Sequence, residues 1–307
     1  MGNGNGLWIV LIVAVLFAGE MKSQESNREP DVKAVAVEDV KDDVWLELPL
    51  DKSKGDDIHR VTHRAMMDGK LQRNYSYCYD EDYYASYWVA YPLCESHISS
   101  GRAEFWSFDD KVDERDQTDV RHGYGASLST ENYERNFYAR GHQIPNADRS
   151  AVAQMQSQTY FSTNMTPQLQ NGFNGGIWAR LESAIRAQVA NADTLYVVTG
   201  ASFSKSGKPE KIKTIINKND SKTLSVPNYY WKAVLKVRRD SAGNIAGASA
   251  IGFWLPHKDL KGHTYQEYTV SADSIETWTG LNLFYALPDS IENKAESNVS
   301  WSSFCNF

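Results

Sequence analysis

Two stretches dominate the sequence: YARGHQIPNADR at residues 138–149 and NMTPQLQNGFNGGIWARLE at residues 164–182. In the first, Pro145 cannot donate a backbone hydrogen bond and bars helix continuation, so His142 is predicted to lie in a strand or a loop. Arg140 and Gly141 place a cation, and a residue that lets backbone approach a ligand, beside this titratable imidazole. By itself the first stretch leaves open whether His142 is functional or structural.

The second stretch is a loop rich in asparagine and glycine that leads into an amphipathic helix predicted over residues 177–190. Asn174 is expected either to cap this helix or to bind a metal ion, because an amide oxygen is a hard donor suited to Mg²⁺. Glu182 is predicted to lie about 80° round the helix from Asn174, within reach of a metal-bound water. Alternatively, Glu182 is an exposed carboxylate or pairs with a neighbouring arginine.

The flanking sequence predicts a mixed α+β domain with a central, mainly antiparallel sheet. Alternating apolar residues indicate strands, and a Ser/Asp start followed by helical spacing indicates one further helix. The strands are expected at residues 75–79, 87–93, 193–200, 228–237 and 245–255, the last two as a hairpin across 240–244, and the helix at 270–283.

The N-terminus has the pattern of an export signal. An unbroken apolar run, residues 7–18, has the length of a signal-peptide core and is too short to span a bilayer, although an uncleaved membrane anchor is the alternative. The sequence predicts a signal peptide at 1–23, a charged linker or arm at 24–65 and one large functional domain at 66–307. The mature protein is expected in the periplasm or outside the cell, without stable membrane association.

Charge and cysteine content limit the partners. The formal net charge of −7 argues against a broad basic surface for nucleic acid. The six lysines of residues 205–222 form either a phosphate-tracking flap or a solvated loop. Three cysteines allow at most one intramolecular disulfide, with Cys78 and Cys94 as one pairing that the sequence does not settle. His59 and His63 are predicted to be surface residues, and residues 109–119 a solvated acidic loop.

Taken together, these motifs resemble the DNA/RNA non-specific endonuclease family. The matching elements are WVAY at 88–91, RGHQ at 140–143, TNMTPQ at 163–168, N-x-G-x-W-x-x-LE at 174–182 and DTLYVVTG at 193–200. They follow the family's order across roughly residues 70–285. Ala139 departs from the family, in which an aspartate often precedes the Arg-Gly-His triplet.

The resemblance implies a ββα-metal (His-Me finger) nuclease fold and a metal-dependent hydrolysis of phosphodiester bonds in DNA and RNA. His142 would be the general base and Asn174 the direct ligand of Mg²⁺, with Mn²⁺ as the alternative ion. Glu182 would orient metal-bound waters, while Arg140 and Asn164 would support the phosphate and the site. Arg102 is the candidate for the arginine that contacts the scissile phosphate, and products with 5′-phosphate ends are expected.

Lys211 and Lys213, in the lysine-rich segment, are added as nucleic-acid contacts. Two alternatives to the nuclease remain: a non-catalytic nucleic-acid-binding protein on the same fold, and a hydrolase of smaller phosphodiesters. The oligomeric state, the preference between DNA and RNA and the existence of an inhibitor protein are not defined by the sequence.

Overall fold

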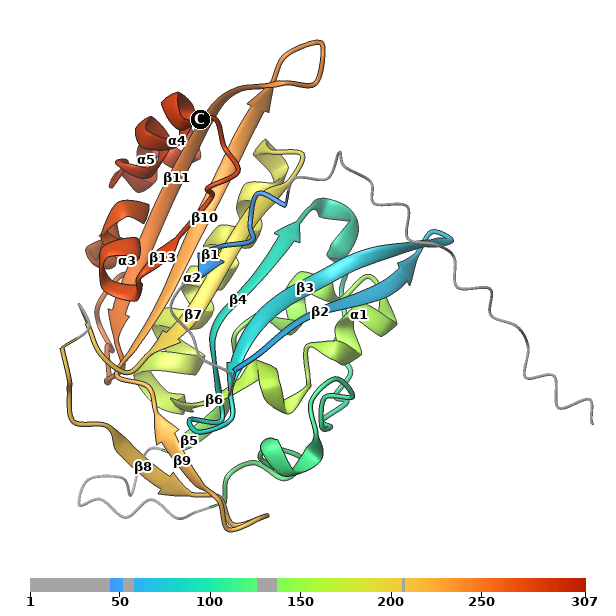
Figure 1. The fold of residues 1–307 in the computed structure, drawn as a ribbon, viewed down its shortest axis with the longest axis vertical. Coiled ribbons are helices and arrows are strands. Elements are labelled where there is room, and N and C mark those ends of the chain that lie inside the picture. Colours follow the sequence, from blue (N-terminus) through green and yellow to red (C-terminus); the bar gives the residue numbers. More distant parts are fainter. Residues whose placement is uncertain (1–44, 52–57, 126–136, 206–207) are drawn as a thin grey trace, which may run out of the picture. The chain divides into compact units, whose positions relative to one another are not determined.

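A seven-stranded antiparallel sheet organises the computed structural model, which describes residues 45–51, 58–125, 137–205 and 208–307. The strands lie side by side in the order β12-β11-β10-β7-β4-β3-β2 (Figure 1). Their bounds are β2 (Ile58–Met67), β3 (Lys70–Asp80), β4 (Ala85–Leu93), β7 (Leu195–Ser202), β10 (Tyr229–Arg239), β11 (Ile245–Pro256) and β12 (Thr269–Val270). The predicted antiparallel sheet is therefore confirmed.

Smaller strand pairs and short helices surround this sheet. The pairs are β1 (Leu50–Asp51) with β13 (Leu281–Asn282), β5 (Tyr138–His142) with β6 (Met165–Leu169), and β8 (Lys213–Ile216) with β9 (Thr223–Val226). The α-helices are α1 (Ala153–Gln158), α2 (Ala179–Arg186), α3 (Ala272–Thr279), α4 (Asp289–Glu296) and α5 (Trp301–Cys305).

Strand β10 shows why the sheet has two different faces. Its side chains alternate, as in any strand, so Tyr230 and Lys232 point toward β6 and the turn after β5, where they bond to Thr166 and to the Gln143 carbonyl. Trp231 points the other way, into the apolar layer that also contains Ile275 of α3 and Ala295 of α4. Burying aromatic and aliphatic side chains on both faces contributes on the order of 1.5–3 kcal/mol each.

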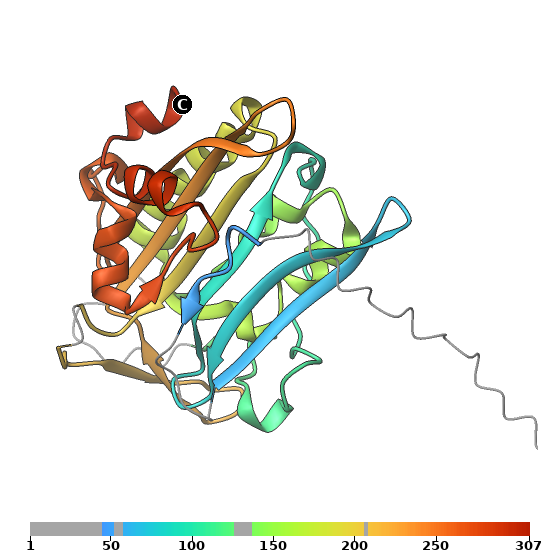
Figure 2. The ribbon, with the colours of Figure 1, turned by 45° about the horizontal axis from the view of Figure 1, so that its top comes forward.

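The two layers can be followed in Figures 1 and 2. Helix α2 and the β5–β6 pair cover one face of the sheet, whereas α3 and α4 lie along β11 on the other. The β10–β11 hairpin turns at Asp240, whose carboxylate accepts bonds from the backbone of Ala242 and Asn244, while Gly243 adopts a left-handed φ of 86°. Glycine adopts this conformation at no steric cost.

The structure extends some expectations and overturns others. Strand β2 begins at Ile58, so part of the segment predicted as a charged arm belongs to the central sheet. Among the described residues no helix is long and apolar enough to cross a membrane. The predicted signal peptide lies outside the described residues. Cys78, Cys94 and Cys305 are free thiols, and Cys78 is buried in β3, so the Cys78–Cys94 disulfide is absent.

Candidate active site

Strand β5 presents the Arg-Gly-His triplet on a short two-stranded ribbon. In this ribbon Gly141 lies opposite Thr166 and His142 opposite Met165. A Cβ atom at Gly141 would lie 2.2 Å from the Cδ atom of Gln168, which leaves no room for any side chain. Gly141 is therefore required for packing against β6, and the ribbon brings His142 to its end as the predicted strand residue.

Asn164 fixes the chain directly behind His142. Its Oδ1 accepts from the Ile144 backbone N–H at 3.0 Å, and its Nδ2 donates to the carbonyls of Ile144 at 3.1 Å and Thr159 at 2.7 Å. Its own carbonyl accepts from the Gln143 N–H. Because every polar atom of this buried side chain is used in these bonds, Asn164 acts on the site by positioning the turn after His142.

The imidazole of His142 sits between two aromatic rings. The Trp106 ring lies 5.6 Å away and the Tyr160 ring 5.2 Å away, both edge-on, as centroid distances. Nε2 is covered from solvent and has no hydrogen-bond partner among the described residues, while the ring interacts with the Arg140 backbone. A carbonyl accepts, so this interaction favours a proton on Nδ1 and an unoccupied lone pair on Nε2.

Burial lowers the pKa of His142 to about 3, and the positive charges of Arg102 and Arg140 lower it further in the same direction. The charged form loses its hydration inside the aromatic box and is repelled by both guanidinium groups. His142 is consequently neutral throughout the physiological pH range, with an unpaired lone pair, which is the state that a general base needs.

Two arginines flank this base. Arg140 donates from Nη1 to the carbonyls of Val120 at 2.9 Å and Arg121 at 3.0 Å, and its guanidinium lies 3.5 Å above the Trp106 ring. Arg102 is more exposed and pairs with Glu104 at 3.3 Å. The structure thus brings Arg102, Arg140 and His142 together, with one arginine held and the other free to turn toward a phosphate.

The loop that carries Asn174 is distorted rather than helical. Asn171, Gly172 and Gly176 have non-helical backbone angles, and α2 proper begins at Ala179. The predicted angle of about 80° between Asn174 and Glu182 assumed a continuous helix, so that derivation was wrong. The Asn174 Nδ2 donates to the Gln170 Oε1 at 2.8 Å, which turns the Asn174 carbonyl oxygen away from Gln170. An amide oxygen held in this way fits the donor chemistry of Mg²⁺.

Glu182 lies in a buried group of charges beside the His142 turn. Burial and the neighbouring Asp148 raise the pKa of its carboxyl, while Lys232 and Arg186 act in the opposite direction. Lys232 donates to the carbonyl of Gln143, the residue after His142. Glu182 is thereby linked through one lysine to the backbone that holds the base. It is not the exposed carboxylate that was the alternative prediction.

The C-terminal part of the lysine-rich segment forms β8 and the turn that leads into β9, and the choice between a phosphate-tracking flap and a solvated loop stays open. Lys211 and Lys213 are both exposed. Lys213 acts electrostatically on His257, whose ring packs 4.9 Å from Phe173, next to Asn174 in the chain. Lys213 therefore lies close enough to His257 to act on it, and the two arginines lie at the His142 end of the ribbon.

Sequence reasoning missed two groups of supporting residues. Trp106 and Tyr160 form the walls around His142, and no pattern in the sequence marks them. His63 is only 2% exposed and shares a 2.8 Å hydrogen bond with the equally buried Asp109, so the prediction of a surface histidine was wrong for His63. The acidic loop is exposed at residues 110–111 and 113–115, as predicted, but buried at its two ends. Asp109 also accepts from Thr163, the residue before Asn164, at 2.7 Å.

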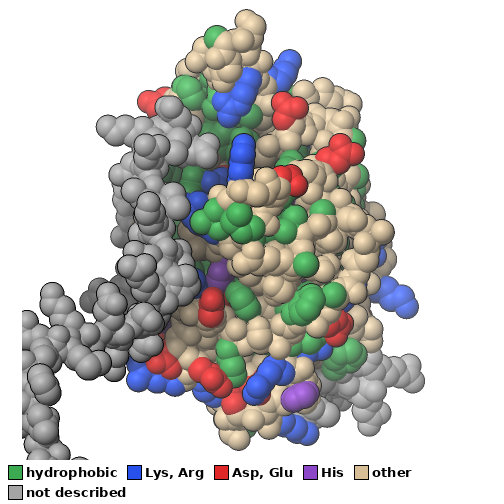
Figure 3. All heavy atoms as spheres, turned by 90° about the vertical axis from the view of Figure 1, so that its right-hand side faces the viewer, with side chains coloured by type: hydrophobic (Ala, Val, Ile, Leu, Met, Phe, Trp, Pro, Cys, Tyr) green, Lys and Arg blue, Asp and Glu red, His purple; other side chains and the backbone are tan. Residues whose placement is uncertain are grey.

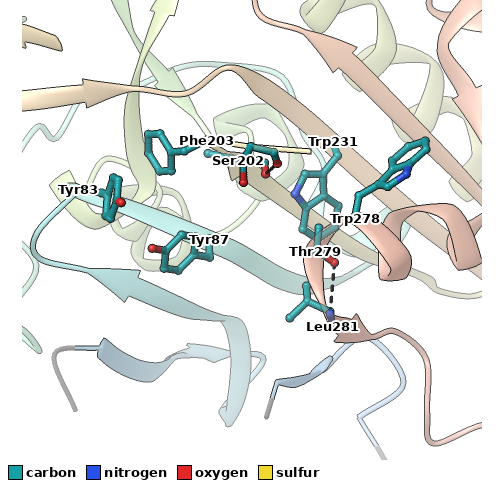
Figure 4. Close-up of a pocket in the computed structure, with 10 residues that line it drawn as sticks. Tyr83, Tyr87, Ser202, Phe203, Trp231, Trp278, Thr279 and Leu281 are labelled. Atoms are coloured by element: carbon teal, nitrogen blue, oxygen red, sulfur yellow. Dashed lines mark hydrogen bonds between the residues drawn. The ribbon is translucent and has the colours of Figure 1, made fainter. Parts of the chain in front are cut away.

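A separate cavity lies on the other face of the sheet, away from His142. Its volume is about 220 Å³ and its wall is largely aromatic (Figure 4). Trp231 forms its floor from β10, Trp278 of α3 lies at one end, and Tyr83 with Phe203 close the other. Since Trp231 and Lys232 point to opposite faces of β10, this cavity is not part of the base-containing site.

Comparisons with known proteins agree with this geometry. Residues 55–290 match the model of the family described as DNA/RNA non-specific endonuclease. The chain is 30% identical to a nuclease of Serratia marcescens over 68% of this chain and 72% of that protein. It is 25% identical to a mitochondrial nuclease of Saccharomyces cerevisiae over 69% and 64% of the two chains.

A solved structure of an EndoG/EndoGI complex resembles the fold, with a TM-score of 0.55 and 20% identity. The similarity covers 75% of this chain and 89% of that one. The central sheet, the β5–β6 ribbon and the helix that follows are consistent with a ββα-metal nuclease. The chain thus belongs to the DNA/RNA non-specific endonuclease family and is an endonuclease that hydrolyses phosphodiester bonds.

Proposed function

We propose that this protein is a metal-dependent, sugar-non-specific endonuclease that cuts both DNA and RNA and leaves 5′-phosphate ends. The observation that carries the proposal is the Nε2 of His142, an imidazole nitrogen buried between Trp106 and Tyr160 that has no hydrogen-bond partner in the described parts of the chain. A buried polar atom without a partner is destabilising. Its retention is understandable where it serves the reaction rather than the fold.

In the proposed reaction, Nε2 of His142 removes a proton from the attacking water, and the Arg140 carbonyl stabilises the resulting imidazolium through Nδ1. The water attacks phosphorus opposite the 3′ oxygen, which leaves with its electron pair. Arg102 is free to form paired hydrogen bonds to phosphate oxygens once it releases Glu104, and Arg140 adds a fixed positive charge. Asn164 positions the turn that carries the base.

Asn174 would hold the metal through its amide oxygen, with Mg²⁺ as the proposed ion and Mn²⁺ as the alternative. A bound divalent ion would act as a Lewis acid on a phosphate oxygen and on the departing 3′ oxygen. Gln170 orients the Asn174 amide. Glu182, held in its charge cluster, would accept hydrogen bonds from waters of the same site.

In this proposal a few basic side chains near the site, and not the net charge of the chain, bind the substrate. The face in Figure 3 carries basic and acidic side chains side by side, and the formal net charge of the chain is −7. Arg102, Arg140, Lys211 and Lys213 would bind backbone phosphates, which carry no direct sequence information. Contacts of this kind account for a lack of sequence preference and predict a strong dependence of binding on salt.

We further propose that the chain is exported, with residues 1–23 as its signal peptide, residues 24–65 as a charged arm that includes the start of β2, and residues 66–307 as the main part of the nuclease domain. The apolar run at residues 7–18 supports export.

The test is the incubation of purified protein lacking residues 1–23 with supercoiled plasmid and with RNA, in Mg²⁺, Mn²⁺ or EDTA, beside His142→Ala. We expect both substrates to be degraded with either metal, with 5′-phosphate ends, and activity to fall by about 10³-fold in the variant. If folded protein binds but does not cut either polymer, the non-catalytic alternative holds. If it cuts only small phosphodiesters, the hydrolase alternative holds.

A further inference from the structure

A group of three carboxylates lies on the sheet face opposite His142. Asp273 and Glu276 come from α3 and Glu296 from α4, and one ligand oxygen of each lies within 4.8 Å of the others. Both helices pack along β11 (Figure 1). Asp273 and Glu276 are three residues apart and so share one side of α3, which brings them together against the end of α4.

Glu296 is the unusual member of this group. Its side chain is 4% exposed, and its Oε1 has no hydrogen-bond partner among the described residues. Other buried carboxylates of this chain have partners: Asp109 accepts from His63, Tyr77 and Thr163, and Asp148 pairs with Arg186 at 2.6 Å. A buried ionised carboxylate without a partner costs several kcal/mol.

The surroundings of Glu296 make this cost larger. The neighbouring charges that act on Glu296 are those of Glu276, Glu292 and Asp273, all acidic. Within the described ranges no salt bridge reaches any of the three carboxylates in the group. The described part of the chain therefore supplies no group that neutralises these carboxylates.

The spacing of the oxygens fits a divalent cation. In a Ca²⁺ site the ion lies about 2.3–2.6 Å from each oxygen, so oxygens on opposite sides of the ion are separated by up to about 5 Å. One oxygen of Glu276 is already fixed by the Leu283 backbone N–H at 2.6 Å, which leaves its other oxygen for the ion. Irregular, carboxylate-rich coordination suits Ca²⁺ better than Mg²⁺, which demands near-octahedral geometry and keeps its waters.

We propose that Asp273, Glu276 and Glu296 form a structural calcium site that joins α3 to α4 and is separate from the catalytic metal. The ion would replace the repulsion between the two helices with shared coordination. Through α3 it would also steady the wall of the aromatic cavity, because Trp278 belongs to the same helix as Glu276 (Figure 4).

Thermal unfolding of the full chain, stripped with EDTA and titrated with CaCl₂ or MgCl₂, tests the proposal without any activity measurement. We expect saturating Ca²⁺ to raise Tm by about 5 °C and the same concentration of Mg²⁺ to raise it much less. Glu296→Gln keeps the side-chain shape but removes the charge. It should abolish the response to Ca²⁺ and raise Tm in EDTA, which also shows that the variant folds.

Asn174→Ala is the matched control, because the proposed catalytic site would lose its ligand while the carboxylate group stays intact. Its response to Ca²⁺ should equal that of the wild type. Tb³⁺ luminescence excited through tryptophan gives a second readout, expected to fall several-fold in Glu296→Gln and in Trp278→Phe but not in Asn174→Ala.

Three results would overturn the proposal: no response of wild type to Ca²⁺, a response that survives in Glu296→Gln, or an equal response to Mg²⁺. In the first case the carboxyl groups share protons instead of a metal ion. None of these results bears on the nuclease proposal, whose test is cleavage.

Discussion

One histidine lies at each end of the β5–β6 ribbon. The two are alike in their burial, their lowered pKa and their aromatic neighbours, but their hydrogen-bond partners differ. His142 ends β5 itself, and His257 follows β11 and docks at the opposite end of the ribbon. Burial lowers the pKa of both, to about 3 for His142 and about 4 for His257. Both rings also pack against aromatic neighbours.

The partners separate the two histidines. His257 accepts from the Leu169 N–H through Nε2 and donates to the Pro227 carbonyl through Nδ1, each at 2.8 Å, so both ring nitrogens are used in the fold. His142 keeps Nε2 without a partner in the part of the chain that the structure describes. A lowered pKa, which both rings share, therefore does not separate the two histidines, whereas the nitrogen without a partner among the described residues singles out His142 as the one available for chemistry.

The largest effect expected from this comparison concerns Asn174. This residue lies in the loop that follows β6 at the His257 end of the ribbon, yet we propose that it binds the catalytic metal. We expect Asn174→Ala to lower kcat by about 10²–10³-fold, through loss of several kcal/mol of Lewis-acid stabilisation, with little change in stability. Gln170→Ala, which removes only the residue that orients the amide, should lower it by about 10-fold.

Cleavage rates against Mg²⁺ concentration, with urea unfolding of each variant, measure both effects. If Asn174→Ala unfolds easily while its remaining folded fraction cuts normally, Asn174 belongs with His257 and the metal assignment fails.

The next largest effect is expected for His257→Ala, which should lower the free energy of unfolding. Removal of the ring leaves the Leu169 N–H and the Pro227 carbonyl without partners, which we expect to cost about 2–3 kcal/mol of the free energy of unfolding. His142→Ala breaks no bond through Nε2 and should change this free energy by much less. Chemical denaturation of both variants measures their free energies of unfolding. Equal losses of stability in the two variants would contradict a structural role for His257 and a free Nε2 in His142.

The sequence predicted the central sheet better than it predicted the surroundings of His142. The alternation of apolar residues was enough to predict the antiparallel sheet, and Pro145 was enough to keep His142 out of a helix, because both signals are local. Pro145 left a strand or a loop for His142, and the pairing of β5 with β6 was not predicted. Trp106, Tyr160 and the His63–Asp109 bond come from distant segments that meet only in the folded chain, so no local spacing marks them. The Asn174–Glu182 angle failed because the non-helical backbone of Gly176, which lies between the two residues, interrupts the helix, and helical periodicity does not encode this backbone conformation.

Gly141→Ala tests whether close packing of β5 against β6 holds His142 in position. A Cβ atom there would overlap the Gln168 side chain at 2.2 Å, so we expect a loss of about 1–2 kcal/mol in stability together with reduced cleavage, as the strand shifts His142. Gly247→Ala is the matched control, since its Cβ would meet only Phe307 at 3.7 Å. A Gly141 variant as stable as the control would show that this end of the ribbon adapts easily.

The smallest expected effect is electrostatic and concerns the pKa of His142 in the free protein. Ordinary histidine has a pKa near 6.5, and here the neutral form is favoured, so the group contributes stability above that value that is lost as the pH falls toward about 3. Arg102 adds to this lowering, and Arg102→Gln should therefore raise the pKa of His142, with the lower limit of the pH–rate profile moving upward.

Arg115→Gln, at an exposed arginine that pairs with Asp113 and Asp116, should leave the titration unchanged. Histidine NMR titration without metal or substrate, assigned through His142→Ala, follows the ring directly. If His142 of the wild type titrates near 6.5, its Nε2 is open to water. His142 and His257 would then differ in their hydrogen-bond partners, but burial could no longer be a property that they share.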